Sequence, residues 1–264
     1  MLLAIQLLLE GNSIRSTQRI TGLDKNTILK AMMLAGNRCD DLAQEMIRNV
    51  PVSEIQADEI WSFIGKKQKK VQASDDSTLG DAYTFVGIER NSKLVLAWHL
   101  GRRTKRDTEA FTEKINQVAA GKFQMTTDGF SAYRDAVSLS LGTRVDFAQL
   151  VKVYAASPEG EHRYSPSEVV STEVVPVIGC PDPKKICTSH VERNNLTMRM
   201  QIRRFTRLTN AFSKKWENHY MMLALFFAYY NFVRIHSTIR VTPAMEAGLA
   251  DHVWTLKELL STQL

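Results

Sequence analysis

The segment from Val52 to Gly65 reads VSEIQADEIWSFIG and has the alternating pattern and the β-branched and aromatic residues of a strand. Two similar segments follow it, AYTFVGIER at Ala82–Arg90 and KLVLAWHLG at Lys93–Gly101. Turn residues precede each of them, at Gly80-Asp81 and Asn91-Ser92. Consecutive strands joined in this way predict an antiparallel meander.

A helix and a further strand follow the predicted meander. TKRDTEAFTEKINQVAAG, at Thr104–Gly121, is amphipathic and ends in glycine, and KFQMTTDGFSAY, at Lys122–Tyr133, reads as a strand that stops at Asp128-Gly129. This order predicts an α/β fold, with a mixed sheet flanked by helices. Residues 139–187 are irregular apart from a strand predicted at Thr172–Gly179, and we interpret them as an insertion or extended connection beside the core.

Two long helices are predicted after this region, at 189–210 and 214–232, and a short helix at the end. The second long helix is rich in aromatic residues, and this pattern favours packing in the core or in a dimer interface over stacking on bases. These residues are Trp216, Phe226, Phe227, Tyr229 and Tyr230.

Residues 1–45 predict three short helices. The first is Leu2–Leu9, the second follows a capping Ser13, and the third, KNTILKAMMLAG, is closed by Gly36. A glycine turn between the last two helices is typical of a helix-turn-helix whose recognition helix enters a major groove. Its exposed side would carry Lys25, Asn26, Thr27 and Lys30. A structural three-helix cap would give the same pattern.

The composition favours a polyanionic partner. The 264 residues include 34 Lys+Arg and 28 Asp+Glu, which gives a net charge of +6. Cys39, Cys180 and Cys187 are too few for a disulfide framework or a four-cysteine zinc site, so we expect free thiols in a reducing cytoplasm. The apolar run at 220–233 is about fourteen residues long, too short to span a bilayer.

Three acids lie where predicted elements begin or end: Asp58 in the first strand, Asp128 at the end of the fourth, and Glu192 in the first turn of a helix. Carboxylates placed in this way can hold two divalent cations about 4 Å apart. Oxygen ligands select Mg²⁺, with Mn²⁺ as the alternative.

Each acid also has a structural interpretation. Asp58 and Glu59 point to opposite faces of a strand, so one of them can simply face solvent. Asp128 precedes Gly129 and can be a turn residue. Ser189 and Glu192 form an S-x-x-E pattern, which predicts a capping box.

A basic face is predicted on the helix that begins near Ser189. On a helical wheel, Arg199 and Arg203 fall within about 20° of Glu192, and Arg204 and Arg207 extend this arc. Arginines spaced in this way suit DNA phosphates, although a solvated basic face gives the same pattern. We interpret His219 and His236 as structural or DNA-contacting residues and not as metal ligands.

Four segments together resemble the DDE transposases of bacterial insertion sequences, most closely the insertion-sequence-one family and its single-frame relatives. They are IQADEIWSFIGKKQKK, MTTDGFSAY, SHVERNNLTMRMQIRRFTRLTNAFSK and YYNFVRIHSTIRVTPAMEAGL. The resemblance covers about residues 2–249. It implies an RNase H-like core at 50–250 and a helix-turn-helix at 1–45. The short helix predicted at the end of the sequence would form a C-terminal tail at 251–264. Relatives often carry a cysteine-rich zinc-binding segment ahead of the helix-turn-helix, which this sequence lacks.

The resemblance also implies an activity. Asp58, Asp128 and Glu192 would bind two Mg²⁺ ions and catalyse DNA cleavage and strand transfer at the inverted-repeat ends of the element. The partners would be double-stranded DNA and at least one further copy of the chain, in the bacterial cytoplasm at the nucleoid. The first alternative is a helix-turn-helix regulator with a vestigial core, and the second is a structure-selective nuclease such as a junction resolvase or RNase H.

Overall fold

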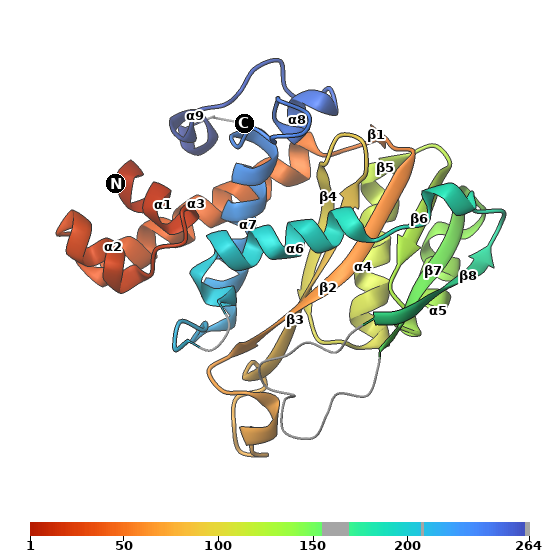
Figure 1. The fold of residues 1–264 in the computed structure, drawn as a ribbon. Helices are drawn as coiled ribbons and strands as arrows, with labels where there is room; N and C mark the ends of the chain where they lie inside the picture. The colour runs from red at the N-terminus through yellow and green to blue at the C-terminus, as the bar shows by residue number, and fades with distance from the viewer. Residues whose placement is uncertain (155–168, 207–208, 262–264) are drawn as a thin grey trace.

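Within residues 1–154, 169–206 and 209–261, the part of the chain that the computed structural model describes, six strands form the central sheet (Figure 1). Their order is β4-β3-β2-β6-β7-β8. Their bounds are β2 Glu54–Ile64, β3 Gly80–Glu89, β4 Val95–Gly101, β6 Phe123–Thr127, β7 Val145–Tyr154 and β8 Val169–Ile178. A separate parallel pair joins β1 (Val50–Pro51) to β5 (Ala119–Ala120).

The sheet is mixed. β2, β3 and β4 pair antiparallel, which confirms the predicted meander. β6 pairs parallel with β2 on its other side, β7 pairs parallel with β6, and β8 returns antiparallel. Two apolar clusters, one on each face, are built from alternate residues of β2: Ile60 and Ile64 on one face, Ile55 and Ala57 on the other. The mixed sheet flanked by helices is the arrangement that we predicted, and it is consistent with an RNase H-like core.

Helices cover both faces of the sheet (Figure 1). On one face lie α4 (Lys105–Val118) and α5 (Ala132–Leu141), and on the other lie α3 (Lys25–Met46), α6 (Ser189–Gln201) and α7 (Trp216–Phe232). The aromatic residues of α7 are mostly buried in the core, as expected. Single 3-10 turns lie at η1 Gln68–Lys70, η2 Gly142–Arg144, η3 Pro183–Lys185 and η4 Arg203–Phe205.

The predicted insertion at 139–187 needs a correction. It contains β7, which hydrogen bonds to β6 over five residue pairs from Phe123–Val145 to Thr127–Gln149. This segment is therefore part of the central sheet and not an addition beside it. The sequence of β7 does not alternate strictly, because Gln149 and Lys152 fall on opposite faces of the strand and neither face is uniformly apolar. Residues 155–168 of the predicted insertion lie outside the described residues.

The N-terminal helices are α1 (Leu2–Leu9), α2 (Ile14–Thr21) and α3, and Ser13 caps α2 by accepting a hydrogen bond from the Ser16 amide. The prediction that Gly36 ends the third helix was wrong, because α3 continues to Met46. A Cβ at Gly36 would lie 2.3 Å from the carbonyl oxygen of Met221 in α7. This glycine therefore permits close helix packing and does not terminate the helix.

The helix predicted at 189–210 also ends earlier, at Gln201. Ile202 adopts an extended backbone conformation, and the chain then forms η4, so that Ile202 and Phe205 are both buried. Beyond α7, the short helices α8 (Pro243–Glu246) and α9 (Leu256–Ser261) follow, and α9 packs against α1, α3 and α7. The C-terminal segment therefore lies beside the N-terminal helices (Figure 1).

Cys39, Cys180 and Cys187 are free thiols, and burial raises the pKa of Cys39 to about 12. Among the described helices, none is both long enough and apolar enough to cross a membrane. The predicted structural role of His219 is confirmed, because its buried ring is hydrogen bonded to Ser62 and Ser213.

Candidate metal-binding active site

Asp58, Asp128 and Glu192 line one cavity of about 640 Å³. The sheet register explains the first pair: β6 ends at Thr127, which pairs with Ala57 of β2, so the next residue of each strand is one of the two acids. α6 packs across β2 and brings Glu192 to the same cavity. Residues separated by 70 and 64 positions are thus brought together by strand pairing and by one helix contact.

Asp58 is held in place from both sides. Its Oδ1 accepts a hydrogen bond from the Glu59 amide at 2.8 Å, and its Oδ2 accepts one from Nδ2 of Asn195, on α6, at 2.9 Å. Burial is the largest cause that raises the pKa of Asp58 to about 6, and the charges of Asp128 and Glu192 act in the same direction. The ionised carboxylate of Asp58 is therefore destabilised where it stands.

Asp128 stabilises a turn, as predicted, and also lines the cavity. Its Oδ1 accepts a hydrogen bond from the Phe130 amide at 3.0 Å, the geometry of a turn that begins with aspartate. Its Oδ2 lies 3.5 Å from a guanidinium nitrogen of Arg103. The side chain is 37% exposed, so this second oxygen can be reached from the cavity.

Glu192 does not form the predicted capping box. Ser189 is the first residue of α6 and not the residue before it, and the cap position, Thr188, makes no side-chain cap hydrogen bond. Instead, the Thr188 hydroxyl donates to Oε1 of Glu192 at 2.5 Å, and Lys152 of β7 pairs with the same oxygen. The carboxylate is thus oriented by neighbours that line the same cavity.

Glu59 is the residue that the sequence interpretation missed. Its side chain is 2% exposed, and its carboxyl pairs with Nε of Arg103 at 3.2 Å and lies next to the Tyr133 hydroxyl. Because β6 stops at Thr127, Asp128 lies at the end of its strand and can approach residues on both faces of β2. The signal in the sequence was the Asp58-Glu59 pair itself, beside a strand that ends in an acid.

Oxygens of Asp58, Glu59 and Asp128 all lie within 4.8 Å of one another, the one such cluster found among the described residues. Burial and the charge of Asp128 raise the pKa of Glu59 to about 8. Its buried Oε1 has no partner at normal hydrogen-bond geometry among the described residues, although the nearby Tyr133 hydroxyl lowers the pKa of this carboxyl in part. Carboxylate oxygens held close together, with one unsatisfied, are the donor set that Mg²⁺ or Mn²⁺ prefers. The residues therefore fit a divalent cation.

The predicted DNA-binding residues fall into different environments. Lys25, Asn26, Thr27 and Lys30 are exposed on the first two turns of α3. Arg199 is partly exposed on α6, and Arg203 is exposed on η4. Because α6 ends at Gln201, the wheel that placed Arg203 and Arg204 beside Glu192 does not apply to them. Arg207 lies outside the described residues.

Arg204 has a structural role. Its guanidinium donates to the carbonyl oxygen of Asn218 at 2.6 Å and to the hydroxyl of Ser213 at 3.3 Å, and it also contacts the sulfur of Met32. Burial lowers its pKa to about 10. This arginine therefore connects η4 to α7 and α3, which the sequence could not indicate because its partners lie on other elements.

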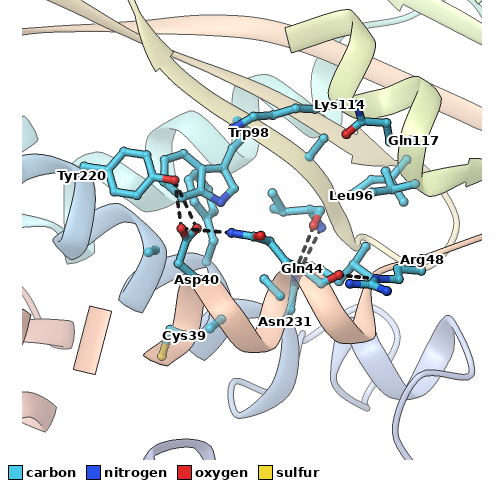
Figure 2. A pocket seen from close by; sticks show the side chains of 18 residues that line it. Cys39, Asp40, Gln44, Arg48, Leu96, Trp98, Lys114, Gln117, Tyr220 and Asn231 are labelled. Atoms are coloured by element: carbon cyan, nitrogen blue, oxygen red, sulfur yellow. Dashed lines mark hydrogen bonds between the residues drawn. The ribbon is translucent and has the colours of Figure 1, made fainter. Parts of the chain in front are cut away.

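A second cavity, of about 510 Å³, lies between α3, α4, α7 and β4 (Figure 2), and Asp58, Asp128 and Glu192 are not among the residues that line it. Tyr220 and Gln44 both donate hydrogen bonds to Asp40 there. The side chain of Asn231 donates to the carbonyl oxygen of Val95 and accepts from its amide, each at 3.0 Å. Asn231 thus satisfies backbone groups of the edge strand β4 that a neighbouring strand would otherwise bind. These hydrogen bonds connect α7 to the sheet, so we assign this region a structural role.

No protein-family model matches the sequence, and no curated protein matches it. Among solved structures, the chain is similar to the cryo-EM structure of the piggyBac transposase synaptic complex with hairpin DNA, at 11% identity and a TM-score of 0.36, over 83% of this chain and 53% of that one. It is also similar to the crystal structure of the Mos1 mariner paired end complex with Mn, at 13% identity and a TM-score of 0.23, over 53% of this chain and 56% of that one. The chain spans about half the length of these proteins. Both TM-scores are low, so the function is inferred from the residues of this chain.

Proposed function

We propose that this chain is a DDE transposase of the bacterial insertion-sequence type, similar to the insertion-sequence-one family. It cleaves DNA and transfers strands at the inverted-repeat ends of its element. The observation that carries the proposal is the convergence of Asp58, Asp128 and Glu192, from β2, the end of β6 and α6, on one open cavity. An elevated pKa at Asp58 supports the binding of positive charge at this place.

Asp58, Asp128 and Glu192 would hold two Mg²⁺ or Mn²⁺ ions, with Glu59 as a further oxygen donor beside them. Bound cations would supply Lewis acidity for phosphodiester cleavage and for attack by a 3′-hydroxyl. Asn195 and Thr188 orient the carboxylates of Asp58 and Glu192.

Two cationic side chains at the cavity can contact DNA. Lys152 pairs with Glu192, and Arg103 pairs with Glu59 and Asp128. A phosphate in the cavity would give both cations a new anionic partner once the acids bind metal. The end of the element would thereby be positioned at the carboxylates.

The exposed residues of α3 provide a separate DNA contact. Lys25, Asn26, Thr27 and Lys30 would read the inverted repeats as the start of a recognition helix. Arg199 and Arg203 would hold the DNA backbone nearer the acids. Two ends must be joined in one reaction, so we expect at least a dimer in the DNA complex.

The test uses labelled duplexes that carry the DNA flanking the coding sequence, with a supercoiled plasmid as target. With Mg²⁺ or Mn²⁺, we expect cleavage at the end of the element and labelled strands joined to the plasmid, and neither product in EDTA. Asp58→Asn, Asp128→Asn and Glu192→Gln should abolish both products. Asp135→Asn is the matched control, because this exposed acid of α5 pairs with Lys105 away from the site.

The outcomes separate the three classes of protein. Cleavage without joined products would identify a structure-selective nuclease. Binding of the ends without cleavage under any metal condition would identify a regulator with a vestigial core. Cleavage by Asp128→Asn at the wild-type rate would show that the acids are wrongly assigned.

A further inference from the structure

Three aromatic rings lie on and beside β2, beyond the acids. Trp61 and Phe63 belong to β2, and Phe212 belongs to the segment that follows η4. The ring centres of Trp61 and Phe63 are 5.6 Å apart, and those of Phe63 and Phe212 are 4.6 Å apart. These three residues, the aromatic platform, line a cavity of about 510 Å³.

Beside the aromatic platform, one edge of β2 has little backbone pairing among the described residues. β6 pairs with β2 only up to Ala57, and the one later contact on that edge within the described residues is the bridge from Ile64 to Ser213. Trp61 and Phe63 are half-buried, in contrast to five aromatic residues of α7 that are buried in the core, Phe226, Phe227, Tyr229, Tyr230 and Phe232. Packing in the core therefore does not account for these rings.

Positive charge surrounds the aromatic platform. The ammonium group of Lys67 lies 5.7 Å from the ring centre of Trp61 and 6.0 Å from that of Phe63, and Lys214 lies over Phe212. Lys69 and Lys70 are exposed in the adjacent turn.

The nearby acids are already engaged. Asp75 pairs with Lys66 at 2.6 Å, and Asp81 accepts a hydrogen bond from the Gln68 amide. Asp81 keeps its negative charge, but Lys67, Lys69, Lys70 and Lys214 outnumber it, so the net charge around the rings is positive. Aromatic faces interleaved with cations are the arrangement that binds unpaired bases together with their phosphates.

We propose that the aromatic platform binds unpaired nucleotides of a DNA strand that passes along β2 from the acids. Trp61 is two residues and Phe63 four residues beyond Glu59 on the same face of β2, distances of about 7 and 13 Å. Stacked nucleotides at about 3.4 Å would cover this distance in about two to four steps. The direction of the strand rests on the proposed function, whereas binding of unpaired bases does not.

The experiment measures fluorescence anisotropy of a labelled oligothymidylate of about 16 nucleotides in EDTA, so that no cleavage intervenes. Trp61→Leu keeps an apolar side chain but removes the aromatic face, and it should weaken binding about 5- to 150-fold. Trp61→Phe keeps a ring and should retain most of the affinity. Lys67→Ala should remove about one phosphate contact and so make the plot of log affinity against log salt concentration less steep.

Two controls accompany these variants. Trp254→Leu replaces a partly exposed tryptophan that packs on Phe232, far from β2 in the sequence, and should bind the oligonucleotide as the wild type does. A blunt duplex should bind Trp61→Leu and the wild type equally, because its bases are paired. Thermal unfolding of each variant verifies the fold, and Trp61→Phe provides the rescue if Trp61→Leu is unstable.

Equal affinity of Trp61→Leu and wild type for the oligonucleotide would overturn the proposal. A change of oligomeric state in Trp61→Leu with unchanged oligonucleotide binding would also overturn it, since the rings would then form a protein interface. Asp58→Asn separates this proposal from the proposed function: this variant should lose cleavage and keep oligonucleotide binding. Should the wild type never cleave DNA, dependence of binding on Trp61 would still support the aromatic platform.

Discussion

Asp58→Asn should make the metal-free protein more stable and should remove its response to divalent cations. At pH 7.5 the carboxyl of Asp58 is ionised in both the folded and the unfolded chain, because this pH lies above the folded pKa of about 6 and the ordinary value of 3.8. A carboxyl whose folded pKa is raised destabilises the fold increasingly as pH rises through this window, and the full effect persists above it. The cost of the ionised form is therefore fully present at pH 7.5.

The magnitude follows from the pKa values and the hydrogen bonds. A tenfold change in proton affinity corresponds to about 1.4 kcal/mol, so the rise from 3.8 to about 6 costs about 3 kcal/mol. Asparagine keeps one acceptor oxygen for the Glu59 amide and Asn195, so one of the two hydrogen bonds is lost, at about 1 kcal/mol. We expect a net gain of about 2 kcal/mol, or about 4–8 °C in Tm for a chain of this size.

Divalent cations should make the wild type at least as stable as Asp58→Asn. A cation at 100 times its Kd stabilises the wild type by about 2.7 kcal/mol, whereas the variant has lost a charged ligand. The assay is thermal unfolding followed by circular dichroism at pH 7.5, in EDTA and across a series of Mg²⁺ and Mn²⁺ concentrations. Asp135→Asn serves again as the control and should follow the wild type in both conditions.

Two results would refute the reasoning. A metal-free Asp58→Asn that is less stable than the wild type would show that the ionised carboxylate is not destabilised by its burial. An unchanged Tm shift with Mg²⁺ in the variant would show that the cation binds elsewhere.

Three further perturbations test the fold. Gly36→Ala should destabilise the protein by about 2 kcal/mol in urea unfolding, because its Cβ would lie 2.3 Å from the Met221 carbonyl oxygen, and a stabilised variant would contradict this. Asn231→Leu leaves the amide and carbonyl of Val95 without their side-chain partner and should cost about 2–5 kcal/mol in the same assay, whereas a loss under 1 kcal/mol would contradict edge pairing. Burial lowers the pKa of His219 from 6.5 to about 3, so the unfolded chain alone takes up its proton and stability should fall by about 2 kcal/mol between pH 6.5 and pH 5. His219→Gln should lose this part of the pH dependence, and an unchanged slope between the two pH values would refute the assignment.

Much of the local structure could be predicted from the pattern of residues. The three-stranded meander, the helix at Lys105–Val118 and the strand that ends before Asp128 were all found from alternation, amphipathicity and turn residues. These signals are local, since each depends on neighbours within one or two turns of the chain. Strand β7 could not be predicted in this way, because its polar residues lie on both faces and break the alternation.

The candidate site was predicted in part. Asp58 and Asp128 could be paired from the sequence because both lie at strand positions that a mixed sheet brings together. Glu59 could not be assigned, since its burial depends on where β6 stops relative to β2. The capping box at Ser189 was a local prediction that failed because α6 begins one residue earlier than that box requires.

The sequence by itself determined most of the strands and helices, apart from β7 and the C-terminal ends of α3 and α6, and showed which acids lie in them. The tertiary structure alone decided that Gly36 is a packing position, that Arg204 points into the protein and that the rings beside Lys67 line a cavity. The physical reason is the range of the interactions. Strand and helix patterns arise from adjacent residues, whereas burial and charge are set by elements that are distant along the chain and meet only in the fold.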